Sequence, residues 1–139
     1  MSYITEKIIM ENPDYAIKWY TENKVLLLTQ FHGGGIEQAI AMMSEANHII
    51  DASPTEKIPV IIDVSRIKTP QQDMNAVINE FRSGRSKKWG FTVVIGAEGI
   101  IKFFAQLFFQ LSGIEVRLAK DLDEGLAILH RVYPNLPDK

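Results

Sequence analysis

Apolar residues follow a strand-like pattern up to about residue 31 and a mainly helical one after it. In the first part the pattern favours β-strands over 7–10, 15–20 and 25–31. The second run alternates, which is typical of a strand with one buried face, and the third is continuously apolar, which favours a central strand. Asn12-Pro13-Asp14 lies between the first two runs and has strong turn-forming chemistry. These residues therefore predict antiparallel strands joined by short turns.

Beyond residue 35, helical spacing alternates with short β-branched runs. The predicted helices cover about 36–52, 71–82, 100–111 and 122–132, and the predicted strands between them cover 60–64, 91–95 and 114–118. Strands that alternate with helices require a largely parallel sheet with helices packed on its faces. We therefore expect an α/β fold with one mixed, largely parallel sheet in the order β-β-β-α-β-α-β-α-β-α, and with the antiparallel pairs at one side.

The composition narrows the classes of protein. With 139 residues we expect a single domain over 1–139, with a core over about 14–133 and a tail over 134–139. A net charge of -2 favours neither nucleic acid nor an anionic membrane as partner. The absence of cysteine excludes disulfides and thiolate metal sites and fits a cytoplasmic protein. We expect no cofactor and no metal site. We also expect no integral membrane association, because the apolar stretch over 100–111 is too short to span a bilayer.

Three stretches are similar to the STAS (anti-sigma factor antagonist, or SpoIIAA-like) family. They are a strand ending in glycine over 25–33, a strand and loop over 61–67, and an acidic cap with an apolar helix over 119–129. Together they resemble the family over nearly the whole chain, and most closely its poorly characterised bacterial members. The resemblance implies the fold and a partner-binding role.

The chain departs from the family at its regulatory position. The family carries a phosphorylatable serine or threonine at the start of the helix that follows the aspartate corresponding to Asp63. The matching positions here are about Gln71 and Gln72, which cannot accept phosphate. Ser65 and Thr69 lie nearby but outside the family pattern. The resemblance therefore does not imply regulation by phosphorylation of that residue.

A candidate ligand site is expected where the strands end. Ligands of open α/β sheets bind outside the carboxyl ends of the strands. The residues expected along this edge are His32, Gly33, Gly34, Asp63, Ser65 and Thr69. The glycines also fit a tight turn from strand to helix, and Asp63 also fits a loop cap, so each has a purely structural interpretation. A basic cluster at Arg82, Arg85, Lys87 and Lys88 fits a solvated loop better than a nucleic-acid site.

The helix over 100–111 is apolar nearly all round. Its widest apolar face is expected to pack on the sheet and contains Ile100, Phe103, Phe104, Leu107, Phe108 and Leu111. Phe109 lies off that face, so it is covered either by flanking helices or by a partner. We assign Phe104, Phe108 and Phe109 to a candidate interface, in the simplest case that of a homodimer.

Three functions remain open. The first is a non-catalytic regulatory or protein-interaction module, homodimeric or bound to another protein, that lacks the family's phosphorylatable serine. The second is a protein that binds an apolar or anionic small molecule, as the related CRAL-TRIO lipid carriers suggest by resemblance. It requires a cavity beside the third helix or at the strand-end edge. The third is a hydrolase, which requires His32 and Asp63 to converge within hydrogen-bond reach. We favour the first.

Overall fold

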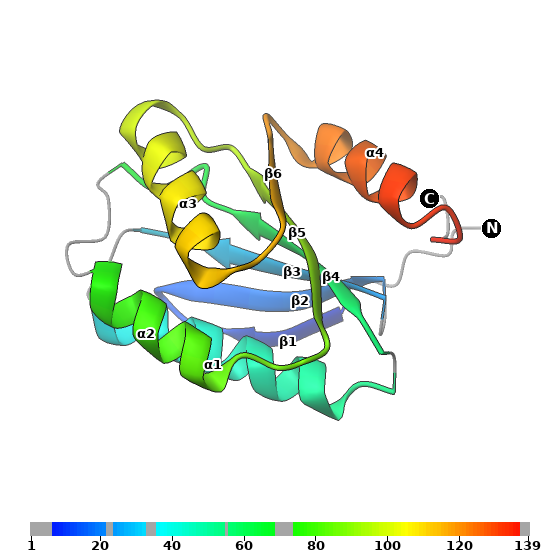
Figure 1. The fold of residues 1–139 in the computed structure, drawn as a ribbon, viewed down its shortest axis with the longest axis horizontal. Helices are drawn as coiled ribbons and strands as arrows, with labels where there is room; N and C mark the ends of the chain where they lie inside the picture. Colours follow the sequence, from blue (N-terminus) through cyan, green and yellow to red (C-terminus); the bar gives the residue numbers. More distant parts are fainter. Residues whose placement is uncertain (1–6, 22–23, 33–35, 55, 69–73, 137–139) are drawn as a thin grey trace.

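The computed structural model describes residues 7–21, 24–32, 36–54, 56–68 and 74–136, and for Lys7, Ile36, Met74 and Phe104 the backbone alone. Within these residues the predicted order of strands and helices is confirmed (Figure 1). The elements are β1 (Lys7–Glu11), β2 (Tyr15–Thr21), β3 (Val25–Gln30), α1 (Ile36–Ala52), β4 (Ile58–Asp63), α2 (Met74–Gly84), β5 (Trp89–Ile95), α3 (Gly99–Ser112), β6 (Val116–Ala119) and α4 (Leu122–Val132).

All described strands form one mixed sheet whose spatial order follows the chain, from β1 at one edge to β6 at the other. The pairs β1–β2 and β2–β3 are antiparallel, and β3 to β6 are parallel. Successive crossovers of one hand place α1, α2 and α3 on the same face of the sheet, and α4 covers the other face beside β5 and β6 (Figure 1). The predicted fold class is therefore confirmed.

Strand β4 begins at Ile58, two residues before the predicted start. The difference arises at Pro59, whose missing N–H normally excludes proline from a central strand. The pairing of β4 with β5 shifts register between Ile58 and Val60, on either side of this proline. The Ile58 N–H donates to the Lys88 carbonyl on the β5 side, so residue 59 faces β3 instead. The described pairing of β3 with β4 begins only at Leu26 and Val60, so no ladder hydrogen bond from residue 59 is needed and the strand can contain the proline.

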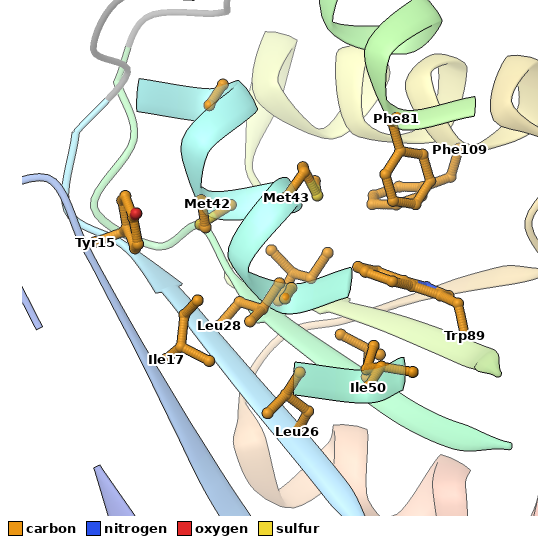
Figure 2. Close-up of a cluster of buried hydrophobic side chains, with 14 of the residues drawn as sticks. Tyr15, Ile17, Leu26, Leu28, Met42, Met43, Ile50, Phe81, Trp89 and Phe109 are labelled. Carbon is orange, nitrogen blue, oxygen red and sulfur yellow. The ribbon is translucent and has the colours of Figure 1, made fainter. Parts of the chain in front are cut away.

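The larger core cluster lies between the sheet and α1 to α3. Tyr15, Ile17 and Trp19 of β2 point into it, as their alternation predicts. Figure 2 shows Phe81 of α2 and Phe109 of α3 together above Trp89 of β5. The Phe81 ring meets Trp89 edge-on at 4.9 Å between centroids and Phe109 edge-on at 6.4 Å. This aromatic group joins α2, α3 and the sheet.

Helix α3 packs with a face that coincides with the predicted one at Phe108 but differs elsewhere. Its buried side chains are Ile101, Phe108, Phe109 and Ser112, all less than 10% exposed. The predicted sheet-facing residues Ile100, Phe103 and Leu111 are instead 57%, 61% and 50% exposed. The reason is that α3 sits between α2 and the last strand, so its buried face is set by contacts with Phe81 as well as with the sheet. We call Ile100, Phe103, Leu107 and Leu111 the α3 stripe.

This arrangement corrects the candidate interface. Phe108 is 9% exposed and Phe109 is 4% exposed, and their rings contact each other at 4.8 Å. Both are held inside the single chain, so neither is available to a partner. The side chain of Phe104 lies outside the described residues. The apolar surface that α3 presents to the outside is the α3 stripe.

The smaller core cluster lies between the sheet and α4. Ile128 and Leu129 of α4 pack there against Phe91 and Val93 of β5. The Tyr133 hydroxyl accepts a hydrogen bond from the Phe91 N–H at 3.1 Å, which fixes the end of α4 to the sheet. Leu136, in the expected tail, also packs against this cluster.

Candidate functional site

The ends of β3, β4 and β5 place the predicted site residues along one edge of the sheet. Thr29 of β3 is in register with Asp63 of β4, and Asp63 with Ile95 of β5, so the chain leaves all three strands at the same level. His32 follows β3 and Ser65 follows β4. Gly33, Gly34 and Thr69 lie outside the described residues, as do Gln71 and Gln72.

His32 pairs with Asp14, which comes from the turn between β1 and β2. The distance from His32 Nε2 to Asp14 Oδ1 is 2.6 Å, so the imidazole donates a hydrogen bond to the carboxylate. The backbone supports this contact, because the Phe31 N–H donates to the Asp14 carbonyl at 2.9 Å. The two side chains are 50% and 32% exposed, so the pair lies at the surface. Its contribution to stability is that of an exposed pair, below about 1 kcal/mol.

Asp63 closes the loop that follows its own strand. Its Oδ1 accepts a hydrogen bond from the Ser65 N–H at 2.9 Å, which is the contact of an Asx turn. The Val64 N–H donates a hydrogen bond to the Ile95 carbonyl at 3.0 Å, so the loop begins in contact with β5. The structural interpretation of Asp63 as a loop cap is therefore the one that its hydrogen bond supports.

Gly96 allows the loops after β4 and β5 to touch. Its φ of +78° lies in the left-handed region. A Cβ placed on it would lie 2.5 Å from Ser65 Cβ and 2.8 Å from Ser65 Cα. Glycine therefore serves both the backbone conformation and the close approach. Ser65 itself is exposed beside this contact.

Arg66 and Phe31 form a contact that sequence reasoning missed. The guanidinium carbon lies 4.9 Å from the centroid of the Phe31 ring, within the range of a cation–π interaction. This contact joins the loop after β4 to the end of β3. Neither residue belongs to a recognisable motif, and they are far apart in sequence, so no local signal indicates the pairing.

The convergence of His32 and Asp63 that a hydrolase would require does not occur. His32 is bonded to Asp14, and Asp63 is bonded to the Ser65 N–H within its own loop. A hydrolase would need one of these groups to activate the other or a shared water from within hydrogen-bond reach. The geometry gives the hydrolase hypothesis no support.

A cavity of about 170 Å³ lies between α1 and α2. Its lining includes Ile40, Asn47, His48, Asp51, Glu80 and Phe81. Pockets for small-molecule ligands usually measure about 300–1,000 Å³, so this one suits at most a few water molecules or a very small ligand. Its place between α1 and α2 is also neither of the two places where the ligand-binding hypothesis expected a cavity.

The basic cluster binds backbone carbonyls near the ends of two helices. Lys88 Nζ donates to the carbonyls of Asp51 and Ser53 at the end of α1, and Arg85 Nη1 donates to the Ser112 carbonyl at the end of α3. Cations are favourable at helix carboxyl ends because the last carbonyls are unpaired and the helix dipole is negative there. The cluster therefore has a structural role at these two positions.

In the described part of the chain, no three histidine, aspartate or glutamate side chains gather closely enough to hold a metal ion. None of the helices described is long and apolar enough to cross a bilayer.

Comparison with known proteins extends the description of the fold. No protein-family model matches the chain, and no curated protein matches it. The crystal structure of an uncharacterized protein from Shewanella loihica, of the DUF3478 family and with a SpoIIAA-like fold, is similar to it with a TM-score of 0.58. The match covers 93% of this chain and 95% of that one, at 14% sequence identity. Such a likeness concerns the fold alone. With its mixed sheet and its alternating helices, the chain has the SpoIIAA-like α/β fold that its sequence resembles.

Proposed function

We propose that this chain is a non-catalytic protein-interaction module that forms a homodimer. The observation that carries the proposal is the α3 stripe, which exposes large apolar side chains on one side of a single helix. Ile100 and Leu111 lie about three turns apart with exposed Phe103 and half-buried Leu107 between them, so the apolar surface extends along the helix. Contiguous apolar surface of this kind marks interaction sites in soluble proteins.

The strand-end edge supports a non-catalytic role. The hydrogen bonds of His32 and Asp63 hold loops and turns in place, and the cation–π contact of Arg66 does the same. A regulatory role would have to act without the family's phosphorylatable residue, because the matching positions are Gln71 and Gln72. We therefore propose that association itself is the property that the module contributes.

Light scattering coupled to size exclusion tests the proposal. The wild-type chain should have the mass of two chains, and Phe103→Glu should shift it toward the mass of one. Phe103 is 61% exposed, so a charge there is tolerated in the folded monomer but not in an apolar interface.

Gln106→Glu is the matched control. It adds the same charge to an exposed position of the same helix, outside the α3 stripe, and should leave the mass unchanged. A wild-type chain with the mass of one chain at all concentrations would contradict the homodimer. Equal effects of the two variants would show that a negative charge anywhere on this helix weakens association, and that the α3 stripe has no special role in it.

A further inference from the structure

Strand β6 ends the described sheet, and its outer backbone groups meet no other described strand. Its neighbour on one side is β5, and among the described residues no strand pairs with its other side. The carbonyls of Glu115 and Ala119 accept hydrogen bonds from the N–H groups of Thr92 and Gly96, so these two residues face the sheet. Because backbone groups alternate in direction along a strand, those of Val116 and Leu118 point outward.

The side chains along this edge would match those of a second copy paired antiparallel to it. Residues 114–118 read Ile-Glu-Val-Arg-Leu. In an antiparallel pair centred on Val116, each apolar residue lies opposite an apolar residue of the second copy, and Glu115 lies opposite Arg117. Glu115 and Arg117 are exposed, and neither has an ion-pair partner within the described part of the chain. We propose that β6 pairs with β6 of a second copy about Val116, which joins two sheets into one.

The backbone geometry agrees with this register at Val116, whereas the Ile114 N–H already donates to the Phe109 carbonyl of its own chain at 3.1 Å. A residue on the two-fold axis of a hydrogen-bonded pair must direct its own N–H and carbonyl toward the partner, and Val116 does so. Glu115 and Arg117 then occupy non-hydrogen-bonded positions, where opposite side chains come closest. Since Val116 and Leu118 pack on the α3 side of the sheet, both charges lie on the α4 side.

Neighbouring registers place unfavourable groups together. A pair centred on Arg117 would put two arginines opposite each other, and Ile114 opposite Lys120. A pair centred on Leu118 would put Glu115 opposite Asp121. Like charges directly opposite destabilise a strand pair, so the register centred on Val116 is preferred.

The α3 stripe lies beside the same edge. Phe109 points from α3 toward Phe81 of α2. At 100° per residue, Ile100, Leu107 and Leu111 lie within about 20° of the opposite side of the helix. Because α2 lies toward the centre of the sheet, that opposite side faces outward past β6 (Figure 1). Pairing of β6 would therefore bring the two α3 stripes together above a continuous sheet.

Strand β1 is the competing edge. Ile8 and Ile9 are exposed there, and Lys7 would lie opposite Glu11 in a pair centred on Ile9. However, the register of β1 against β2 shifts between Ile8 and Met10. A bulge of this kind twists an edge and protects it from pairing, so β6 is the better template.

The inference rests on the proposed homodimer and specifies how it forms. Its test uses Glu115→Arg and Arg117→Glu, alone and mixed. Each variant alone places like charges opposite each other twice in the dimer, so its dissociation constant should rise about tenfold or more. An equimolar mixture restores opposite charges at both positions, so the mass measured by light scattering should return to that of a dimer.

Controls separate this inference from the general proposal. Lys24→Glu, at an exposed turn, should leave the dimer unchanged. Glu11→Arg should also leave it unchanged, and weakening by this variant alone would place the contact at β1 and overturn the β6 register. A wild-type dimer that neither β6 variant weakens would overturn the register while leaving the homodimer standing. A monomeric wild type would overturn both.

Discussion

Replacement of Phe109 by alanine tests which face of α3 belongs to the core. Phe109 is 4% exposed, and its ring lies edge-on to Phe108 at 4.8 Å and to Phe81 at 6.4 Å. Phe103 lies on the same helix but is 61% exposed. The two substitutions remove the same atoms from the same helix. They differ chiefly in whether those atoms are buried within the single chain.

The expected costs differ by several kcal/mol. Removal of a buried phenylalanine side chain costs about 3–5 kcal/mol, from lost transfer free energy and from the cavity that remains. Each edge-on ring contact contributes about 0.5–1.5 kcal/mol beyond the buried area. The free energy of unfolding of small domains is about 5–15 kcal/mol in total, so Phe109→Ala should remove a large share of the stability. In the monomer, Phe103→Ala should change the free energy of unfolding by about 0.5 kcal/mol or less.

Urea unfolding followed by tryptophan fluorescence measures both values. Trp19 and Trp89 are 7% and 5% exposed, so their emission should report loss of the core. All variants must be unfolded at a protein concentration low enough to keep the chains monomeric, because loss of a dimer contact at Phe103 would otherwise lower the apparent stability. Equal losses for Phe103→Ala and Phe109→Ala, or a larger loss for Phe103→Ala, would refute the assignment of the buried face.

Two further substitutions test the loops and the packing of α1. Gly96→Ala should lower the free energy of unfolding by about 2 kcal/mol or more, because it combines a left-handed conformation with a clash against Ser65. Thermal unfolding should show a smaller loss for Gly113→Ala, which has a φ of +75° but no neighbour within 4 Å of its Cβ position. Asn47→Ala should cost about 1–3 kcal/mol in urea unfolding, because the buried Ser86 N–H would lose its acceptor at 2.7 Å. The exposed Ser44→Ala should cost about 0.5 kcal/mol or less, and an equal loss there would contradict this reasoning.

The order of the elements could be predicted because hydrophobic periodicity is a local property. The alternation of Tyr15, Ile17 and Trp19 placed β2 correctly, and helical spacing located α1 to α4. The start of β4 was missed because a proline in a central strand is tolerated only where no ladder hydrogen bond from its position is needed, here just before the β3–β4 pairing begins. Where that pairing begins depends on the neighbouring strand, which a local pattern does not contain.

The contacts of the strand-end edge were harder to predict for the same reason. Asp14 was assigned to a turn, and its bond to His32 depends on the antiparallel register of β2 and β3, which places Tyr15 opposite Gln30. The contact of Arg66 with Phe31 depends on the parallel register of β3 and β4. Asp63 was predictable as a loop cap, because its partner Ser65 lies two residues away.

Helix α3 shows why an apolar surface could not be assigned from its own sequence. A helix with one apolar face has a single way to pack, but α3 has two, and its neighbours decide between them. Phe81 of α2 occupies the position that selects Phe108 and Phe109 for the core. The α3 stripe is then left outside, next to β6, and within the described part of the chain the outward backbone groups of β6 and the charges of Glu115 and Arg117 have no partner. One association, centred on Val116, would cover the α3 stripe, pair the Val116 backbone groups and bring Glu115 and Arg117 of the two copies opposite each other.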